Sequence, residues 1–120
     1  MEVFFLKICY KPNSNLTWKL LKSVTGNTSV TLPSDFSELL VEIEAPTDSN
    51  YCYTFHILKS MLKTTYKRYF GGFYYQNGAN GSASYGVCKL SVSSTTLYLY
   101  ELFAYYTNVT SSCTVNVYYK

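Results

Sequence analysis

The stretch FGGFYYQNGANGSASYGVCKLSVS, residues 70–93, places two segments rich in aromatic and β-branched residues on either side of a polar turn. Asn77-Gly78 and Asn80-Gly81 are dipeptides that tolerate positive φ angles and close hairpins. The flanking segments are rich in Tyr, Phe and Val, which favour strands over helices. The stretch therefore predicts two antiparallel strands joined by a tip at 77–82.

The same alternation recurs along the rest of the chain. Turn-forming clusters separate short alternating segments at intervals of about 8 to 14 residues, a spacing typical of sandwiches and barrels. Strands are predicted at 2–10, 16–24, 28–32, 38–45, 51–58, 70–76, 84–93, 96–105 and 112–119. LKSMLKTTYKRY (58–69) is expected to form an irregular crossover between two sheets, and LPSDFSELL (32–40) allows one helical turn. The expected fold is all-β: a single antiparallel, jelly-roll-like β-sandwich domain over residues 1–120, with eight or nine strands.

Composition and charge exclude several classes of function. The 120 residues are 48% hydrophobic and 14% charged, with a net charge of +3 and 14 tyrosines. The ten basic residues are scattered, so electrostatics does not indicate nucleic acid as a partner. Glu2 and Lys7 interrupt the apolar start, and no apolar run reaches the roughly 20 residues that span a bilayer. We expect no signal peptide and no membrane insertion.

The four cysteines, Cys9, Cys52, Cys88 and Cys113, lack the C-x-x-C spacing of zinc and redox sites. No metal and no cofactor is predicted. Cys88 and Cys113 fall on apolar strand faces, which favours buried free thiols. Disulfides remain the alternative.

Candidate catalytic residues are few. His56 is the only histidine and lies within a predicted strand, where a hydrogen-bonded or surface histidine is the favoured interpretation. Glu42 and Glu44 lie about 7 Å apart along one strand, a separation that would suit a pair of glycosidase carboxylates. Because they alternate with Val41 and Ile43, an outward-facing solvated pair explains them better. No catalytic residue is assigned, and the chain is not expected to be an enzyme.

Two segments rich in aromatic residues are candidates for contact with another molecule. The first surrounds the predicted tip, where Tyr, Ser, Gly and Asn have the composition of antibody paratopes. Packing of the tyrosines across strands is the alternative, and it is somewhat favoured. The candidate ligand-binding residues of this first segment are Arg68, Tyr69, Tyr74, Tyr75, Asn77, Asn80 and Tyr85. Gly71-Gly72 beside them predicts a bulge or the close approach of another group.

The second aromatic-rich segment is TLYLYELFAYY, residues 96–106. Strand alternation places Leu97, Leu99 and Phe103 on the core face and Tyr98 and Tyr100 on the other. An exposed row of phenol rings is either solvated or covered by another subunit. Tyr98 and Tyr100 are therefore candidate subunit contacts.

Three segments carry a resemblance to a known class of domain: TWKLLKSVTGNTSVTLPSDFSELLVEI (17–43), GGFYYQNGANGSASYGV (71–87) and TNVTSSCTVNVYYK (107–120). They resemble β-rich domains that phages and prophages of gut bacteria carry in tail-fibre and head-fibre proteins. The resemblance spans nearly the whole chain. It implies a jelly-roll-like sandwich in a virion, made in the bacterial cytoplasm, packed as a symmetric homotrimer, with its distal loops on a bacterial surface glycan or protein.

The leading hypothesis is a non-enzymatic, virion-associated binding module, such as a fibre tip. The alternative is a structural or decoration protein whose aromatic faces serve subunit assembly. A glycan-cleaving enzyme that uses Glu42 is the least favoured class.

Overall fold

A computed structural model of the chain describes residues 17–46, 52–62, 66–77, 82–106 and 109–120, with side chains for all of these except 73–77, 82–84, 106 and 109–110. The described residues form nine β-strands and a short 3₁₀ helix, Lys59–Met61. The strands are β1 (Lys19–Thr25), β2 (Thr28–Thr31), β3 (Glu38–Glu44), β4 (Cys52–Leu58), β5 (Lys67–Asn77), β6 (Ser82–Val92), β7 (Thr96–Tyr106), β8 (Val109–Ser112) and β9 (Thr114–Tyr119).

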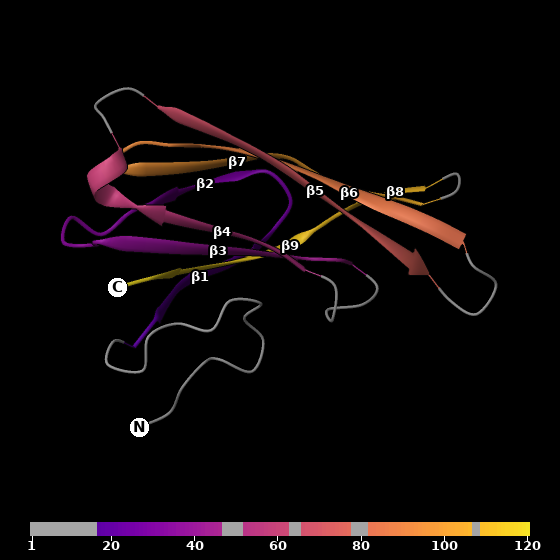
Figure 1. Ribbon diagram of the computed structural model, residues 1–120, viewed down its shortest axis with the longest axis horizontal. Coiled ribbons are helices and arrows are strands. Elements are labelled where there is room, and N and C mark those ends of the chain that lie inside the picture. Colours follow the sequence, from indigo (N-terminus) through magenta and orange to yellow (C-terminus); the bar gives the residue numbers. More distant parts are fainter. Residues whose placement is uncertain (1–16, 47–51, 63–65, 78–81, 107–108) are drawn as a thin grey trace.

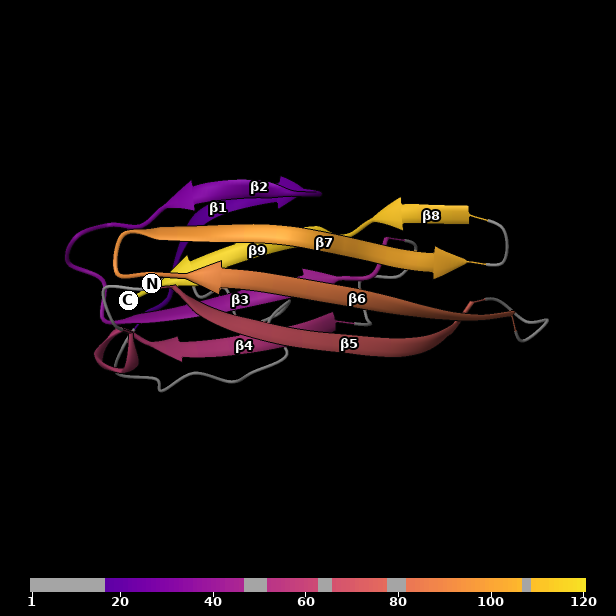
Figure 2. The ribbon, with the colours of Figure 1, turned by 90° about the horizontal axis from the view of Figure 1, so that it is seen from above.

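The strands form two antiparallel sheets packed face to face (Figure 1). The four-stranded sheet has the order β1-β9-β3-β4, and the five-stranded sheet has the order β2-β7-β6-β5, with β8 also paired to β7. Figure 2 looks down on the five-stranded sheet, with the four-stranded sheet beneath it. β1 and β2 pair with β9 and β7, so early and late strands lie side by side in both layers. The predicted all-β antiparallel sandwich is confirmed.

The strand positions follow the sequence pattern closely. The hairpin predicted from residues 70–93 is confirmed, because β5 and β6 pair without interruption from Lys67 with Val92 to Asn77 with Ser82. The predicted strand at 112–119 divides at Cys113, where the chain passes from the five-stranded to the four-stranded sheet. The predicted crossover after β4 is also present. The predicted strand at 2–10 lies outside the described residues.

Before β3, a hydrogen-bonded turn stands where the sequence allowed one helical turn. The amide of Phe36 donates to the carbonyl of Pro33 at 3.3 Å, and no helix follows. No helix among the described residues has the length and apolar character needed to cross a membrane.

The core lies between the sheets and consists of the inward-facing residue of each alternating pair. Its residues include Val30, Phe36, Leu39, Val41, Ile43, Phe55, Ile57, Cys88, Leu90, Val92, Leu97, Leu99, Leu102, Ala104, Val115 and Val117. Gly71 of β5 faces this core at the point where the rings of Tyr53 and Phe55 approach from the four-stranded sheet. The register of β5 with β6 is unbroken there, so Gly71-Gly72 marks a close approach and no bulge.

A bulge occurs instead in β7 and corrects one prediction. Lys89 of β6 faces Tyr100, and Val87 faces Phe103, so two residues of β7 oppose one of β6 between those pairs. Glu101 has a φ of 53°, the left-handed conformation that a bulge of this kind requires. Phe103 is therefore outward-facing with Tyr100, and Leu102 takes the core position that the sequence assigned to Phe103.

Candidate binding surface

The outward face of the five-stranded sheet carries a group of aromatic side chains, here called the outer aromatic face. Its members come from β5, β6 and β7, and core residues such as Leu90, Leu99 and Ala104 alternate with them. The outer aromatic face consists of Phe70, Tyr85, Tyr98, Tyr100, Phe103 and Tyr105. Phe70 is 70% exposed, Tyr85 55% and Tyr98 42%, so these rings are open to contact with another molecule.

Contacts between the rings hold several of them in fixed relation to one another. Tyr85 and Tyr105, which are partners in the register of β6 and β7, stack with ring centroids 5.1 Å apart. Tyr105 also lies 6.2 Å from Phe103. Tyr66, just before β5, meets Tyr98 edge to face at 5.2 Å. Rings held in this way lose little conformational entropy when a ligand binds.

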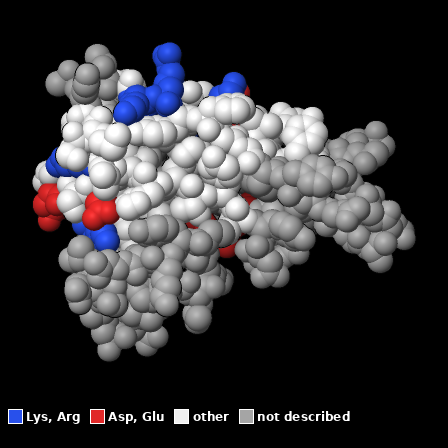
Figure 3. Space-filling view, in the orientation of Figure 1, with Lys and Arg blue, Asp and Glu red and all other residues white. Residues whose placement is uncertain are grey.

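The charges on this face are largely compensated. Lys89 Nζ lies 2.5 Å from Glu101 Oε2 and 5.9 Å from the centre of the Phe70 ring. The hydrogen bond to Glu101 raises the pKa of Lys89. Arg68, on the same face of β5 as Phe70, is exposed. Figure 3 views the molecule from the side of β5, where the centre of the visible described surface is white and so carries neither basic nor acidic residues.

The predicted ligand-binding residues divide between the two sides of the sheet. Arg68 and Tyr85 lie on the outer side. Tyr69 points inward, packs edge to face against Phe55 at 6.2 Å, and has its pKa raised by burial, so its ring belongs to the border of the core. It is therefore not part of the outer aromatic face.

The remaining predicted residues are placed only by their backbone. Tyr74 pairs in register with Tyr85, Tyr75 with Ser84 and Asn77 with Ser82. The structure does not describe the side chains of Tyr74, Tyr75 and Asn77. Asn80 lies outside the described residues.

Tyr98 and Tyr100 face outward, and Leu97 and Leu99 are buried, as alternation predicts. Phe103 and Tyr105 were missed as surface residues because the bulge at Glu101 reverses the alternation after it. Glu101 gives no sequence signal for the left-handed conformation, since Gly, Asn and Asp are the residues that favour it. The surface group is thus larger than the sequence indicated.

The outer side of the four-stranded sheet differs from its prediction. Glu42 is fully buried, and the prediction of a solvated Glu42–Glu44 pair is wrong for this residue. Asn116 Nδ2 donates to Glu42 Oε1 at 3.1 Å, and Ser23 Oγ donates to Asn116 Oδ1 at 2.7 Å. Burial, followed by the charges of Glu42 and Glu44, raises the pKa of nearby Tyr118. This side of the sheet therefore buries polar groups that alternation alone assigns to solvent.

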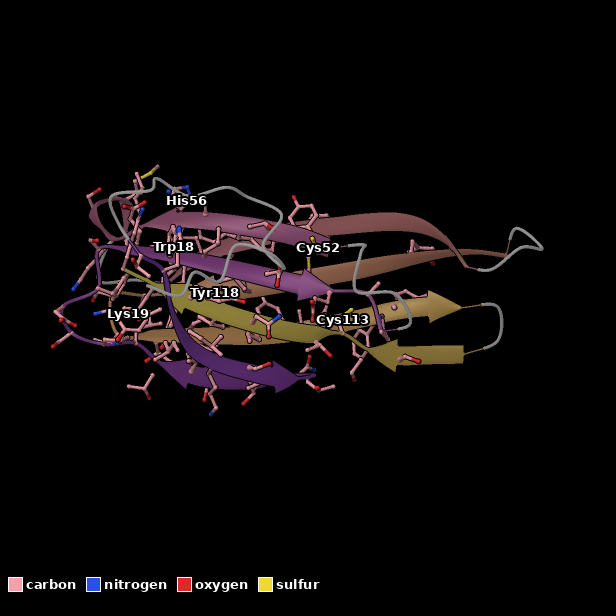
Figure 4. The ribbon with its side chains drawn as sticks, turned by 90° about the horizontal axis from the view of Figure 1, so that it is seen from below. Trp18, Lys19, Cys52, His56, Cys113 and Tyr118 are labelled. Carbon is pink, nitrogen blue, oxygen red and sulfur yellow. The ribbon has the colours of Figure 1, made fainter. Side chains whose placement is uncertain are left out.

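His56 belongs to a cluster at one end of the same side, where Figure 4 shows it near Trp18. Its Nε2 lies 2.7 Å from Glu38 Oε1, and its ring meets that of Trp18 at 5.7 Å. Lys120 Nζ lies 3.6 Å from Glu38 Oε2 and 4.4 Å from the Trp18 ring centre. The predicted hydrogen-bonded histidine is confirmed. Trp18 also packs with Leu40 and Tyr118 in a small second core.

The described cysteines include both free thiols and a disulfide-bonded residue. Cys88 and Cys113 are buried free thiols, as predicted, and Cys52 is disulfide-bonded. Burial raises the pKa of Cys88 to about 12 and that of Cys113 to about 11, so neither is a nucleophile at neutral pH. The described part of the chain contains no group of three or more His, Cys, Asp or Glu residues that could hold a metal ion.

Comparisons with protein-family models, curated proteins and solved structures found no match. The chemistry of the chain's own surface is thus what indicates a function. Tyr66, Phe70, Tyr85 and Tyr98 are four of the large apolar side chains that are exposed in the described residues, and all four lie on or beside the outer aromatic face. This face is the candidate binding surface.

Proposed function

We propose that the chain is a non-enzymatic binding module of a phage virion, which recognises a carbohydrate of a bacterial surface through the outer aromatic face. The exposure of Phe70, Tyr85 and Tyr98 on one side of a single sheet is the observation that carries this proposal. The resemblance of the sequence to fibre domains supports the assignment to a virion and to a bacterial surface.

Aromatic rings suit carbohydrates because the C–H faces of a sugar ring stack on them while hydroxyl groups accept and donate hydrogen bonds nearby. Tyrosine supplies both functions, with an apolar ring and a phenolic hydroxyl. The stacked pair Tyr85 and Tyr105 and the edge-to-face pair Tyr66 and Tyr98 provide such rings at two places. These pairs are partly preorganised, which lowers the cost of binding.

The charge distribution favours a neutral or weakly anionic carbohydrate. Lys89 is already engaged by Glu101, whereas Arg68 is exposed and offers several donors in a planar group. A strongly anionic polymer would require several uncompensated cations, and the sheet face presents few of them. A neutral glycan needs only the rings and the tyrosine hydroxyls.

A glycan array with the wild-type chain, followed by affinity measurement on any glycan that binds, tests the proposal. We expect Tyr85→Ala to weaken binding about tenfold, equivalent to about 1.4 kcal/mol, which is the scale of one aromatic stacking contact. Met61→Ala is the matched control, because Met61 is also exposed but lies in the 3₁₀ helix. Absence of binding over a broad panel, or equal affinity of Tyr85→Ala and wild type, would contradict the proposal.

A structural role in the virion is the second candidate function, and the exposure of Phe70 favours it. A ring that is 70% exposed, with no hydroxyl group, gains more from burial in a protein contact than from a wet carbohydrate site. A stable oligomer that is silent on the glycan array would support this second role.

A further inference from the structure

In the described part of the chain, the edge of the five-stranded sheet formed by β5 is long and is not covered by another strand. β5 has 11 residues, and among the described residues it pairs only with β6. Its outer edge therefore presents a row of backbone donors and acceptors that can pair with another strand. Figures 1 and 2 together place this edge on the side that faces the viewer in Figure 3.

The other sheet edges carry features that discourage strand pairing. β2 and β8 have four residues each, and short edge strands offer few hydrogen bonds. β1 has a register shift between Leu20 and Lys22 and carries lysines. β4 has seven residues and bears His56, which pairs with Glu38 of β3.

β5 has none of these protective features beyond its first two residues. Its register with β6 is regular, it contains no proline, and it is uncharged from Tyr69 to Asn77. Natural sheets interrupt such edges with charges, prolines or bulges, because an uninterrupted edge associates with a second strand.

We propose that β5 pairs antiparallel with β5 of a second copy of this chain, about a twofold axis through Gly71. Charge selects the antiparallel direction. Lys67 and Arg68 stand at one end of β5, and parallel pairing would place the cations of the two copies side by side. Antiparallel pairing centred on Gly71 places Lys67 opposite Tyr75 of the second copy, about 26 Å along the strand from the other Lys67.

The register follows from the side chains of the outer face. A twofold axis perpendicular to the sheet pairs outward-facing residues with outward-facing residues. Centring on Gly71 places Phe70 opposite Gly72 of the second copy, so an exposed ring covers an exposed position that has no side chain. Aromatic residues across from glycine stabilise strand pairs in this way. Centring on Gly72 would leave two outward-facing glycines opposite each other and is therefore disfavoured.

The resulting dimer joins two five-stranded sheets into one continuous sheet. The outer aromatic faces of the two copies then lie on the same side, next to each other. The pairing does not depend on what the outer aromatic face binds, and it gives a dimer where the resemblance to fibre domains implies a trimer.

Two measurements test the pairing. Sedimentation or light scattering should give twice the 13.7 kDa monomer mass at high concentration. Amide hydrogen exchange followed by NMR reports the mode of association. In the monomer every second amide of β5 bonds to β6 and is protected, whereas in the proposed dimer consecutive amides near Gly71 become protected as concentration rises.

Two variants separate edge pairing from contact between the outer aromatic faces. Phe70→Asp places like charges near the twofold axis and should leave a folded monomer, and the milder Phe70→Ala should weaken dimerisation at least about tenfold. Tyr98→Asp is the matched control, because Tyr98 is exposed on the same side but lies on β7, two strands from the edge. It should remain dimeric.

Three results would overturn the proposal. The first is a monomer at every concentration up to about 1 mM, the limit of weak association. The second is a trimer. The third is an oligomer of any size in which the protection of β5 amides still alternates, or which Tyr98→Asp dissociates while Phe70→Asp does not.

Discussion

Replacing Gly71 by alanine should destabilise the protein, although the same change in an ordinary strand is stabilising. An ideal Cβ at Gly71 would lie 2.6 Å from Cε1 and Cζ of Tyr53 and 3.0 Å from Cζ of Phe55. The Tyr53 ring packs against Phe55 with centroids 4.9 Å apart, so any retreat of the ring disturbs that contact as well. Overpacking of this kind costs about 1–3 kcal/mol, while alanine regains about 0.5–1 kcal/mol of strand propensity. The net loss should therefore be about 1 kcal/mol, and at most about 2.5 kcal/mol.

A double-mutant cycle identifies the cause of that loss. Urea unfolding of Gly71→Ala, Tyr53→Ala and the double variant, at protein concentrations low enough to keep the chain monomeric, gives the three free energies. If the clash with Tyr53 is responsible, the double variant should be at least about 1 kcal/mol more stable than the sum of the single losses predicts. A Gly71→Ala protein as stable as wild type, or two losses that simply add, would refute the packing described between the sheets.

Two further predictions concern pH and the bulge. The free energy of unfolding should fall between pH 9 and 10. In the unfolded chain the thiols lose their protons near the ordinary pKa of 9.0, whereas burial keeps Cys88 and Cys113 protonated in the folded chain. For each thiol, the free energy of unfolding then decreases with a slope that approaches about 1.4 kcal/mol per pH unit. Urea unfolding at pH 8, 9 and 10 should show this fall in wild type, and most of the fall should be absent from the Cys88→Ala, Cys113→Ala double variant. Equal dependence of the unfolding free energy on pH in the two proteins would contradict the prediction. At the bulge, Glu101→Gly should stabilise the protein by about 0.5–1 kcal/mol and Glu101→Val should destabilise it, because the left-handed conformation suits glycine and strains β-branched residues. Loss of the exposed ion pair with Lys89 should change the stability little. Thermal melts of the two variants that rank in the opposite order would show that Glu101 is not left-handed.

Strand positions and the all-β class were predictable from sequence because they depend on local properties. Alternation of side chains, the β propensity of Tyr, Val and Thr, and the turn preference of Asn-Gly all act within a few residues. The hairpin of β5 and β6 illustrates this, since its register follows from the turn that closes it at Asn77 and Ser82. The exposure of Tyr85, Tyr98 and the charged Arg68 follows from the same alternation.

Where the alternation breaks, and which outward-facing positions are nevertheless buried, depended on contacts between residues far apart in sequence. The bulge at Glu101 moves Phe103 to the surface, and Glu42 is buried beside Asn116, which lies 74 positions later in the chain. Gly71 is needed because Tyr53 arrives from the opposite sheet. Sheet packing brings such residues together only after the chain has folded, so no local pattern encodes them, and the extent of the outer aromatic face emerged only from the tertiary structure.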